Sequence, residues 1–405
     1  MMHPEQCVRM VVCVPVRRMM SHLACRFCAN PESSVHVVDP LVDLRFRFED
    51  KQKLRKMLKA RKFDVDVEDV ELKYRKWWKA YENVCADLSK EKRDSSLKRQ
   101  MLDESEGLLG ALRLPNDLAP ETPTDDASLN VGFNGDPPKH MVFLRKAGMV
   151  KVDESTSSVY TIGLPTSLHS AVEKAIVQHF SASSMLISPP HMVRGAVIEA
   201  VNVPKETFPS FSSSGDTSSN YLTGHGLISL LSVFTKTHFA ASSNQWPIHV
   251  LSSGSSYRNS STGNTKPNLY EASQRKIVAL LSICVDEGQE CAEMESLVDE
   301  FEGLLKRSLG FPIKETLLMA CQLHNYESCA TSFVYGEHVE VGRISRSGTY
   351  IPSRLNIVHD SKDVGKVEFV HLVYAEIDIT RLVGMIVEEN IMGEQPVANV
   401  IAQLL

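Results

Sequence analysis

The sequence predicts an α+β fold, in which a mixed, mainly antiparallel sheet is backed by helices and preceded by an antiparallel helical hairpin. Apolar residues at steps of three and four begin at Val67, and a weaker pattern of the same kind follows a polar break. A stretch rich in Pro, Asp, Asn, Thr and Gly separates this part from the rest. Beyond it, helical and strand patterns mix without strict alternation, which is typical of a mainly antiparallel sheet.

The composition is that of a soluble globular protein. The chain has 405 residues, room for two or three domains, with 43% hydrophobic and 23% charged residues. No run of about 18 apolar residues occurs, so the sequence predicts no membrane-spanning helix and no membrane partner. The formal net charge of −6 gives no sign of nucleic-acid binding as a whole-chain average. The nine cysteines are scattered, which favours reduced thiols over a disulfide framework.

The first 30 residues have the pattern of a targeting segment. They carry four arginines and a single acid, Glu5, with short apolar stretches between them. Arginine-rich, acid-poor composition is the signature of a mitochondrial transit peptide, so we expect a protein of the mitochondrial matrix. Cys25 and Cys28 form a lone Cys-x-x-Cys pair. Because a structural zinc site needs a second pair of ligands and none follows, the sequence predicts no metal site.

Residues 45–115 are predicted to form a helical arm. A polar break at residues 89–96 offers a turn, and a second helical pattern runs to Pro115, where proline cannot continue a helix. A short turn between two helices predicts an antiparallel pair. We expect Trp77 to pack in the seam and Trp78 to flank it rather than stack on bases. The apolar positions are Val67, Val70, Tyr74, Trp77, Tyr81, Val84 and Leu88 in the first helix, and Leu97, Met101, Leu108 and Leu112 in the second.

Basic residues are concentrated in this arm. Residues 51–100 hold 16 Lys or Arg against 9 Asp or Glu, a local excess of +7 in a chain of net −6. A basic helix face is often only solvated surface, but such an excess against an acidic background is better explained by a phosphate backbone. The sequence therefore predicts RNA binding through cations outside the seam: Lys73, Arg75, Lys76, Lys79, Lys90, Lys92, Arg93, Lys98 and Arg99.

A linker at residues 116–138 leads to a core domain, residues 139–405. An amphipathic helix is expected over residues 167–180. Two serine-rich stretches, at residues 210–219 and around 252–262, are predicted to be loops. Strands are expected at Met185 to Ser188, Ile248 to Leu251, Ile277 to Val285, Thr331 to Val334 and Lys366 to Tyr374.

A series of short motifs resembles the seryl-tRNA synthetases over about residues 45 to 395. Leu114-Pro115-Asn116 is similar to the family's Ile-Pro-Asn at the exit of the arm. The motifs of the class II core follow in order, and the first of them forms the family's dimer interface. They are Leu186 to Val193 for motif 1, Tyr257-Arg258 and Asn268-Leu269-Tyr270 for motif 2, the run from Glu340 to Arg354, and Arg381 for motif 3. The resemblance implies a class II synthetase-like sheet with a tRNA-binding arm.

Three acids of the family's active site have no counterpart in this chain. Active relatives hold the serine amino group with the Glu of a Thr-x-Glu loop, and the loop here ends in His225. The motif 2 acid near ATP corresponds to Ser260, and the acid near the serine hydroxyl on the returning strand to Ala279. The resemblance therefore implies a pocket that cannot hold serine as its relatives do.

Other positions reverse or add charge. Glu271 stands where the family has an arginine that faces substrate. Arg343 stands at the position of the magnesium-site serine, and Arg346 at that of an asparagine. A guanidinium at a metal-ligand position repels the metal. Three positions of the motifs are retained, namely Arg258, Glu340 and Arg381.

These departures predict a protein without synthetase activity. Adenylation needs ATP phosphates, magnesium and a carboxylate held in line. Each lost charge-assisted contact is worth about 1.5–3 kcal/mol, so five losses suppress the reaction by several orders of magnitude. A degenerate site with a basic arm resembles the seryl-tRNA synthetase-like insect mitochondrial proteins. That resemblance implies tRNA binding, with tRNA-Ser the expected RNA, no cofactor, and dimers with itself or with the active mitochondrial seryl-tRNA synthetase.

The alternative is a divergent but active mitochondrial serine–tRNA ligase with a rebuilt pocket. The losses of acid at His225, Ser260 and Ala279 favour the non-catalytic interpretation over this one.

Overall fold

The computed structural model of the chain describes residues 43–87, 95–124, 138–211, 220–240, 245–259, 266–361 and 366–392. The predicted transit peptide, the turn of the arm, most of the predicted linker and the carboxy-terminal residues from 393 lie outside these ranges. Within them, no helix is both long and apolar enough to cross a bilayer.

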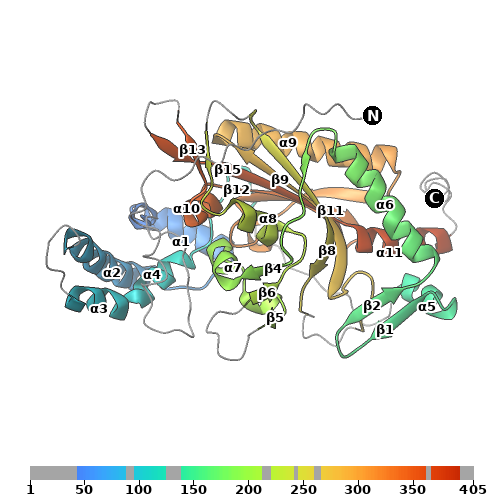
Figure 1. Ribbon diagram of the computed structural model, residues 1–405, viewed down its shortest axis with the longest axis horizontal. Helices are drawn as coiled ribbons and strands as arrows, with labels where there is room; N and C mark the ends of the chain where they lie inside the picture. The colour runs from blue at the N-terminus through green and yellow to red at the C-terminus, as the bar shows by residue number, and fades with distance from the viewer. Residues whose placement is uncertain are drawn as a thin grey trace.

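A seven-stranded sheet organises the core (Figure 1). Every neighbouring pair of strands is antiparallel except β3 and β8, which run parallel. The predicted mixed, mainly antiparallel sheet is therefore confirmed. Across the sheet the strands are β10 (Ile313–Leu317), β11 (Cys329–Tyr335), β12 (Val339–Gly348), β15 (His371–Asp378), β9 (Gln274–Cys284), β8 (Ile248–Tyr257) and β3 (Met185–Leu186).

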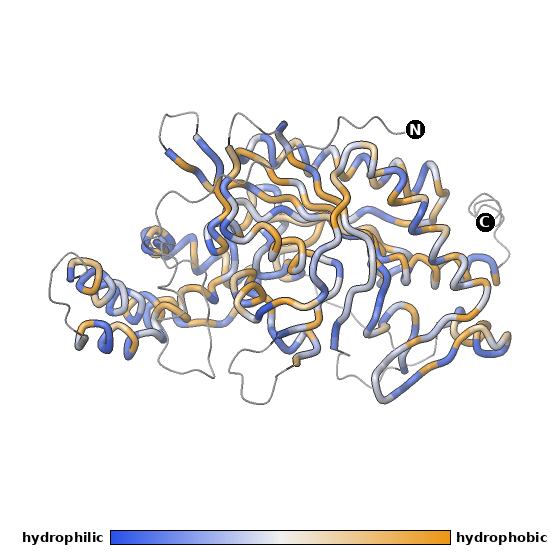
Figure 2. Tube along the Cα trace, viewed as in Figure 1, coloured by the Kyte–Doolittle hydropathy of each residue, from blue (hydrophilic) through white to orange (hydrophobic). Residues whose placement is uncertain are grey.

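Both faces of this sheet are covered, so its central strands are apolar on both sides, as the hydropathy of the trace shows (Figure 2). On β9, Val278 and Leu280 point into one apolar cluster, whereas Ile277 and Leu281 point into the other. The first face carries α5 (Lys139–Lys146), α6 (Leu164–Phe180), α9 (Glu287–Glu302) and α11 (Ile379–Met392); the second carries α7 (Gly195–Val201), α8 (Leu227–Phe234) and α10 (Tyr350–Leu355).

Three small sheets surround the main one. They are β1 (Val150–Asp153) with β2 (Ser158–Thr161); β4 (Met192–Arg194), β6 (Asn220–Leu222) and β5 (Ser210–Phe211); and β14 (Val367–Phe369), β13 (Val358–Asp360) and β7 (His238–Phe239).

The prediction that the serines from residue 252 form a loop is wrong, because β8 continues to Tyr257. Its backbone pairs with β9 along the whole run, from Ser252 opposite Ala279 to Tyr257 opposite Gln274. The serines satisfy their hydroxyl groups inside the fold: Ser252 and Ser256 are buried, and Ser253 donates to Glu173 at 2.6 Å. Paired backbone therefore overrides the loop preference of serine.

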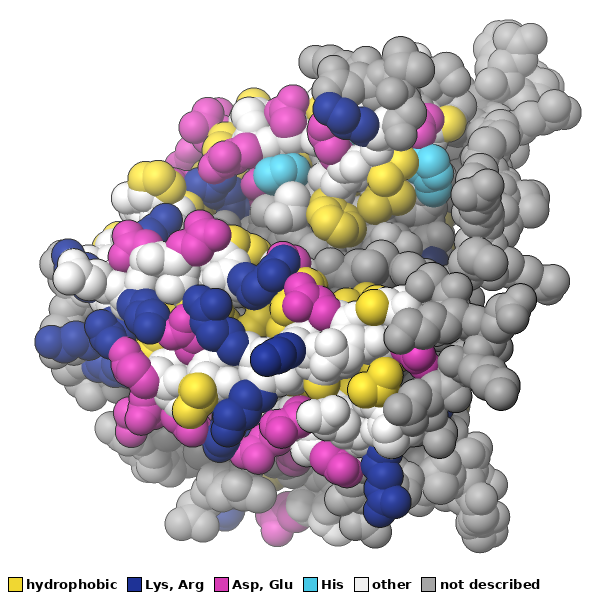
Figure 3. Space-filling view, turned by 90° about the vertical axis from the view of Figure 1, so that its left-hand side faces the viewer, with side chains coloured by type: hydrophobic (Ala, Val, Ile, Leu, Met, Phe, Trp, Pro, Cys, Tyr) yellow, Lys and Arg dark blue, Asp and Glu magenta, His cyan; other side chains and the backbone are white. Residues whose placement is uncertain are grey.

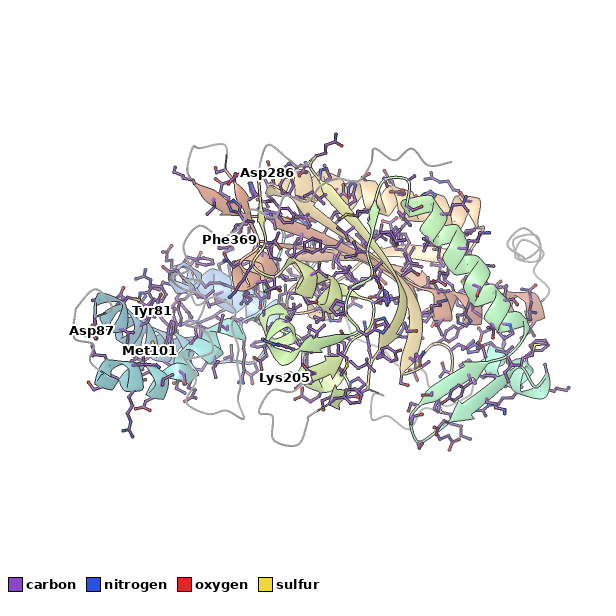
Figure 4. The ribbon with its side chains drawn as sticks, viewed as in Figure 1. Tyr81, Asp87, Met101, Lys205, Asp286 and Phe369 are labelled. Carbon is purple, nitrogen blue, oxygen red and sulfur yellow. The ribbon has the colours of Figure 1, made fainter. Side chains whose placement is uncertain are left out.

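The arm is a helical hairpin, as predicted. Helix α2 (Val67–Asp87) packs against α3 (Ser95–Asp103) and α4 (Ser105–Leu112), which a turn at Glu104 separates. Trp77 is fully buried in the seam and Trp78 is half-buried beside it. Tyr81 of α2 and Met101 of α3 lie between the two helices (Figure 4). A Cβ on Gly107 would lie 2.2 Å from the Lys73 carbonyl oxygen, so the close approach of α4 to α2 requires glycine there.

A further helix, α1 (Lys51–Ala60), joins the hairpin to the core, and the sequence analysis did not identify it. The joint is made by buried donors that bond to backbone carbonyl oxygens. Arg61, after α1, donates to the carbonyl oxygens of His324 (3.2 Å) and Glu327. Arg354 of α10 donates to the carbonyl oxygen of Leu112 at 3.1 Å. Arg47, Asn116 and Tyr350 make further bonds of this kind across the joint.

Candidate functional site

A cavity of about 310 Å³ opens on the second face of the sheet, where β8 and β15 end. This volume is at the lower end of the range for small-molecule sites. Its charged lining consists of Arg258 and Glu376, and its aromatic lining of His324, Tyr326 and Tyr374. The cavity therefore lies beside the residues that resemble the family's motifs 2 and 3.

Strand β15 supplies the side chains at the floor of the cavity. Alternate residues Tyr374, Glu376 and Asp378 point to this face, while the residues between them belong to the opposite apolar cluster. The Tyr374 hydroxyl donates to Glu376 at 2.5 Å and accepts the Leu227 N–H at 3.2 Å. Burial and the neighbouring Glu376 raise the pKa of Tyr374 well above its ordinary value. Glu376 also faces Arg258, whose Nη2 lies 3.9 Å from its Oε1.

Asp378 holds two arginines at the same end of the sheet. The Arg275 guanidinium of β9 donates to its Oδ2 at 2.5 Å, with both side chains buried. Arg381 Nε lies 3.4 Å from the same oxygen. Arg381 also donates to the carbonyl oxygens of Tyr270 (2.9 Å) and Glu340 (2.7 Å). The arginine retained at the motif 3 position is thus bonded to groups of its own chain.

Arg343 lies in a second charged cluster on β12. It contacts Glu327 at 2.5 Å and Glu340 at 3.1 Å. A β-bulge interrupts the pairing of β12 with β11 at Val341, because Glu340 lies opposite Val334 and Gly342 opposite Phe333. The extra residue places Glu340 and Arg343 on one face of the sheet. Burial alone would raise the pKa of Glu327, but Arg343 and His324 together outweigh burial and hold that pKa below its ordinary value. Glu327 is fully buried, whereas the Arg343 side chain keeps an exposed fraction of 15%.

The charges of the site balance one another. Among the described residues, four arginines face four carboxylates, and each arginine has a carboxylate within 4 Å. A triphosphate binds where basic groups are left unneutralised. This arrangement offers little net positive charge for such an anion. The eight groups, here called the charge network, are Arg258, Arg275, Arg343, Arg381, Glu327, Glu340, Glu376 and Asp378.

His225, predicted at the lost serine-binding position, lies at the edge of the sheet. Its Nδ1 is 2.7 Å from Ser252 Oγ, and its Nε2 is 3.1 Å from Nε2 of His191. Gly254 of β8 makes room for the ring, because a Cβ there would lie 2.3 Å from it. Burial, and then the neighbouring His191, lower the pKa of His225. A separate cavity of about 530 Å³, lined also by Leu186, lies on this side.

The other predicted site residues are dispersed. Ala279 is buried on the cavity face, directly opposite Glu376 in the sheet. Arg346 points to the α9 face, where it donates to Cys291 Sγ at 2.8 Å and pairs with Glu121. Glu271 is half-buried in the turn before β9, and Ser260 lies outside the described residues. The structure therefore brings together Arg258, Glu340, Arg343 and Arg381 and leaves Arg346 apart.

Half of the charge network was not predicted from the sequence. Arg275, Glu327, Glu376 and Asp378 were not among the predicted site residues. A signal was available for two of them, since Tyr374, Glu376 and Asp378 alternate with apolar residues at the end of an expected strand. Glu327 carries no such pattern, because it lies in a loop between β10 and β11. In the described part of the chain, no three His, Cys, Asp or Glu side chains are grouped to hold a metal ion.

The predicted RNA-binding cations of the arm fall into two groups. Lys73 pairs with Asp69 and Glu106, and Arg75 with Glu71, so the arm's own acids neutralise both. The others within the described ranges are exposed and make no ion pair there. Positive and negative side chains are interspersed at this end of the molecule (Figure 3). The exposed cations are Lys76, Lys79, Lys98 and Arg99, and the remaining predicted ones, Lys90, Lys92 and Arg93, lie outside the described residues.

Solved structures with the same architecture are aminoacyl-tRNA synthetases. The cytoplasmic serine-tRNA ligase of Naegleria fowleri, in complex with AMP, superposes with a TM-score of 0.68 over 89% of this chain and 97% of its own, at 15% identity. The fold is that of the seryl-tRNA synthetases. The seryl-tRNA synthetase of Pyrococcus horikoshii, complexed with ATP, superposes with a TM-score of 0.65 over 85% of this chain and 93% of its own, at 14% identity.

A more distant similarity is to the prolyl-tRNA synthetase of Giardia lamblia in complex with prolyl-adenylate. Its TM-score is 0.55 at 12% identity, over 61% of this chain and 50% of that one. The sequence matches no protein-family model and no curated protein. At these identities the similarity establishes the fold alone, and the predicted class II synthetase-like core with its helical arm is confirmed at that level.

Proposed function

We propose that this chain is a non-catalytic protein of the seryl-tRNA synthetase fold that binds tRNA, with tRNA-Ser the expected RNA, in the mitochondrial matrix. The observation that carries the proposal is the charge network, in which every arginine of the site is paired with a carboxylate of the chain itself. ATP and magnesium are not bound, and serine is not transferred.

Binding of ATP at this site would have to break existing pairs. Arg343 already forms an ion pair with Glu340, the one acid retained at the metal position. The Ser332 hydroxyl donates to the same carboxylate at 2.8 Å. Arg381 is bonded to two carbonyl oxygens. Freeing a buried charge from its partner costs about 3–5 kcal/mol, which the new contacts to a phosphate would first have to offset. Self-pairing therefore opposes binding of the nucleotide.

Binding of tRNA is supported by the arm. Its exposed cations, Lys76, Lys79, Lys98 and Arg99, have no carboxylate partner among the described residues. An exposed lysine or arginine without an intramolecular partner is available to a phosphate. The hairpin also projects from one end of the molecule, where an RNA can reach it (Figure 1).

Charge reversal in the arm should weaken tRNA binding at least tenfold. The variant changes Lys90, Lys92, Arg93, Lys98 and Arg99 to Glu, which removes phosphate contacts and adds repulsion. Affinity of the native protein, measured by gel-shift titration, should also fall steeply with salt. Reversal of Lys73 and Arg75 is the control, because both are already paired with acids and should matter less. If the five-residue variant and the native protein bind tRNA with equal affinity, the basic residues of the arm are only solvated surface and do not contact RNA.

We further propose that the chain forms dimers through residues 181–208, with a second copy or with the active mitochondrial seryl-tRNA synthetase. The apolar residues that the sequence predicts for this surface fall into a buried group and an exposed group in the structure. Val193, Val197 and Ile198 are buried in the chain's own core, so they do not contribute. Three others are exposed, by 36%, 59% and 48%: Met185, Leu186 and Met192. Three exposed apolar side chains within one short stretch of the chain favour a protein partner.

Replacement of Leu186 and Met192 by Glu should convert dimers to monomers. Both side chains are exposed, so the monomer's fold should tolerate the change, whereas a buried apolar interface would not. Sizing and native mass measurement, with and without the co-expressed mitochondrial synthetase, give the oligomeric state. Replacement of the exposed Val367 by Glu is the control for a remote apolar site. A native protein that is monomeric under both conditions would reject the interface.

A further inference from the structure

Helix α1 is the most basic element of the described chain. Its ten residues, Lys-Gln-Lys-Leu-Arg-Lys-Met-Leu-Lys-Ala, contain five cations and no acid. These five cations belong to the local charge excess of residues 51–100, but none of them was among the predicted RNA contacts. Acids occur only beyond its two ends, at Glu49 and Asp50 before it and at Asp64 and Asp66 after it.

The inward half of α1 is used for packing. Leu54, Met57 and Leu58 are buried in the apolar cluster of the arm. Arg61, immediately after the helix, bonds to carbonyl oxygens of the core. Two of the helix's cations are paired with acids of α2, namely Lys51 with Glu71 and Arg55 with Glu68. The helix is therefore held firmly at the junction between the arm and the core.

The outward half of α1 carries three lysines that are not used in this way. Lys53, Lys56 and Lys59 are exposed and have no ion pair among the described residues. They follow one another at intervals of three residues, so their Cα atoms rise by about 4.5 Å from one to the next. Three cations on a fixed helix lose less entropy on binding an anionic backbone than three on a loop.

We propose that Lys53, Lys56 and Lys59 form a second RNA-contacting surface, which holds the phosphates of a tRNA where it passes the base of the arm. The inference rests on the proposed tRNA binding and specifies a contact outside the hairpin. Its chemical basis is that the acids of α2 neutralise Lys73 and Arg75, whereas the cations of α1's outward half are left available. The basic surface thus extends from the hairpin toward the core.

A membrane surface is a poorer partner for the same lysines. A helix that binds anionic lipid inserts an apolar face between the headgroups. The apolar face of α1 is buried, with exposed fractions of 3%, 6% and 3% for Leu54, Met57 and Leu58. Only charge remains on the outside, and charge alone matches a polyphosphate backbone.

The test neutralises the three lysines by Lys53→Gln, Lys56→Gln and Lys59→Gln in the full chain. Affinity for tRNA should fall at least tenfold at about 0.1 M salt, and the slope of log affinity against log salt should decrease by about 2–3, since each phosphate contact contributes roughly 0.7–0.9. The matched control is Lys146→Gln, Lys151→Gln and Lys314→Gln, which removes the same charge from exposed positions of the core and should leave both quantities unchanged.

The outcomes separate this inference from the proposed function. A native protein that does not bind tRNA overturns both. If the native protein binds, the arm variant is weakened and the α1 variant is not, only the inference about α1 is overturned. An equal loss in the core control would show that total charge matters rather than this helix, which also overturns it. A last experiment measures binding to vesicles of phosphatidylcholine and cardiolipin. If the three Lys→Gln changes weaken binding to these vesicles but not binding to tRNA, the surface is assigned to lipid instead.

Discussion

Purified protein supplied with serine, ATP, magnesium and pyrophosphate should show no serine-dependent ATP–pyrophosphate exchange. Adenylation needs basic groups free to take up phosphate charge, and in this site each of the four arginines is paired with a carboxylate of the chain. His225, which was predicted to stand in place of the acid of the Thr-x-Glu loop, contacts Ser252 and His191. We expect a rate at least four orders of magnitude below that of an active seryl-tRNA synthetase.

The measurement has two parts. Exchange of labelled pyrophosphate is followed beside an active seryl-tRNA synthetase as the positive control, and binding of ATP with magnesium is followed by calorimetry. Micromolar affinity for ATP together with serine-dependent exchange would contradict the proposal and favour the divergent, active ligase. Micromolar affinity for ATP without exchange would contradict the proposed absence of ATP binding, although the protein would still be non-catalytic.

Replacement of Glu327 by Gln should reduce the free energy of unfolding by about 3–5 kcal/mol. The side chain is fully buried and pairs with Arg343 at 2.5 Å, so its loss leaves a guanidinium desolvated with one partner fewer. Equilibrium unfolding in urea measures the change. The double variant Glu327→Gln with Arg343→Met should recover much of the stability, because removing both charges avoids the unpaired one.

A partly exposed ion pair provides the control for this experiment. Lys306 and Glu302 are i,i+4 partners at the surface, 2.9 Å apart. Replacement of Glu302 by Gln should leave the free energy of unfolding nearly unchanged, because water screens such pairs. If the Glu327 variant were equally stable, or if the double variant were no more stable than the single one, Arg343 would not depend on this carboxylate.

The fold could be predicted from the sequence where periodicity was strong. The seam from Val67 to Val84 predicts α2, and burial of Tyr74 and Trp77 follows from it. Several elements, among them α9 and α11, were not predicted, and for two of the missed elements the physical reason is clear. Helix α1 is short and basic, with only three apolar residues on its buried side. Strand β12 lies in the interior of the sheet, between β11 and β15, but Glu340, Arg343 and Arg346 interrupt its apolar pattern.

The site could be predicted only in part. Motif resemblance located Arg258, Arg343 and Arg381, because their neighbours in sequence carry the pattern. Arg381 and Arg343 each have a carboxylate partner three residues earlier in the chain, Asp378 and Glu340. The partner of Arg258, Glu376, comes from a distant strand, and spacing along a sequence does not tell which strands become neighbours. Arg346 shows the same limit, since the bulge at Val341 and the alternation of β12 decide which face each side chain takes.

The bond from Arg61 to the loop at His324 and Glu327 has a consequence for how this molecule can transmit binding energy. One end of that loop bears the aromatic lining of the cavity, and its carbonyl oxygens are anchored to the base of the arm. A movement of this loop therefore alters its bonds to Arg61 at the base of the arm, and a movement of Arg61 alters the loop. Under the proposed binding of tRNA to the arm, a small molecule that displaced His324 from Arg61 on entering the cavity is expected to change the affinity of the arm for RNA. By thermodynamic reciprocity, RNA would change the affinity for that molecule by the same factor.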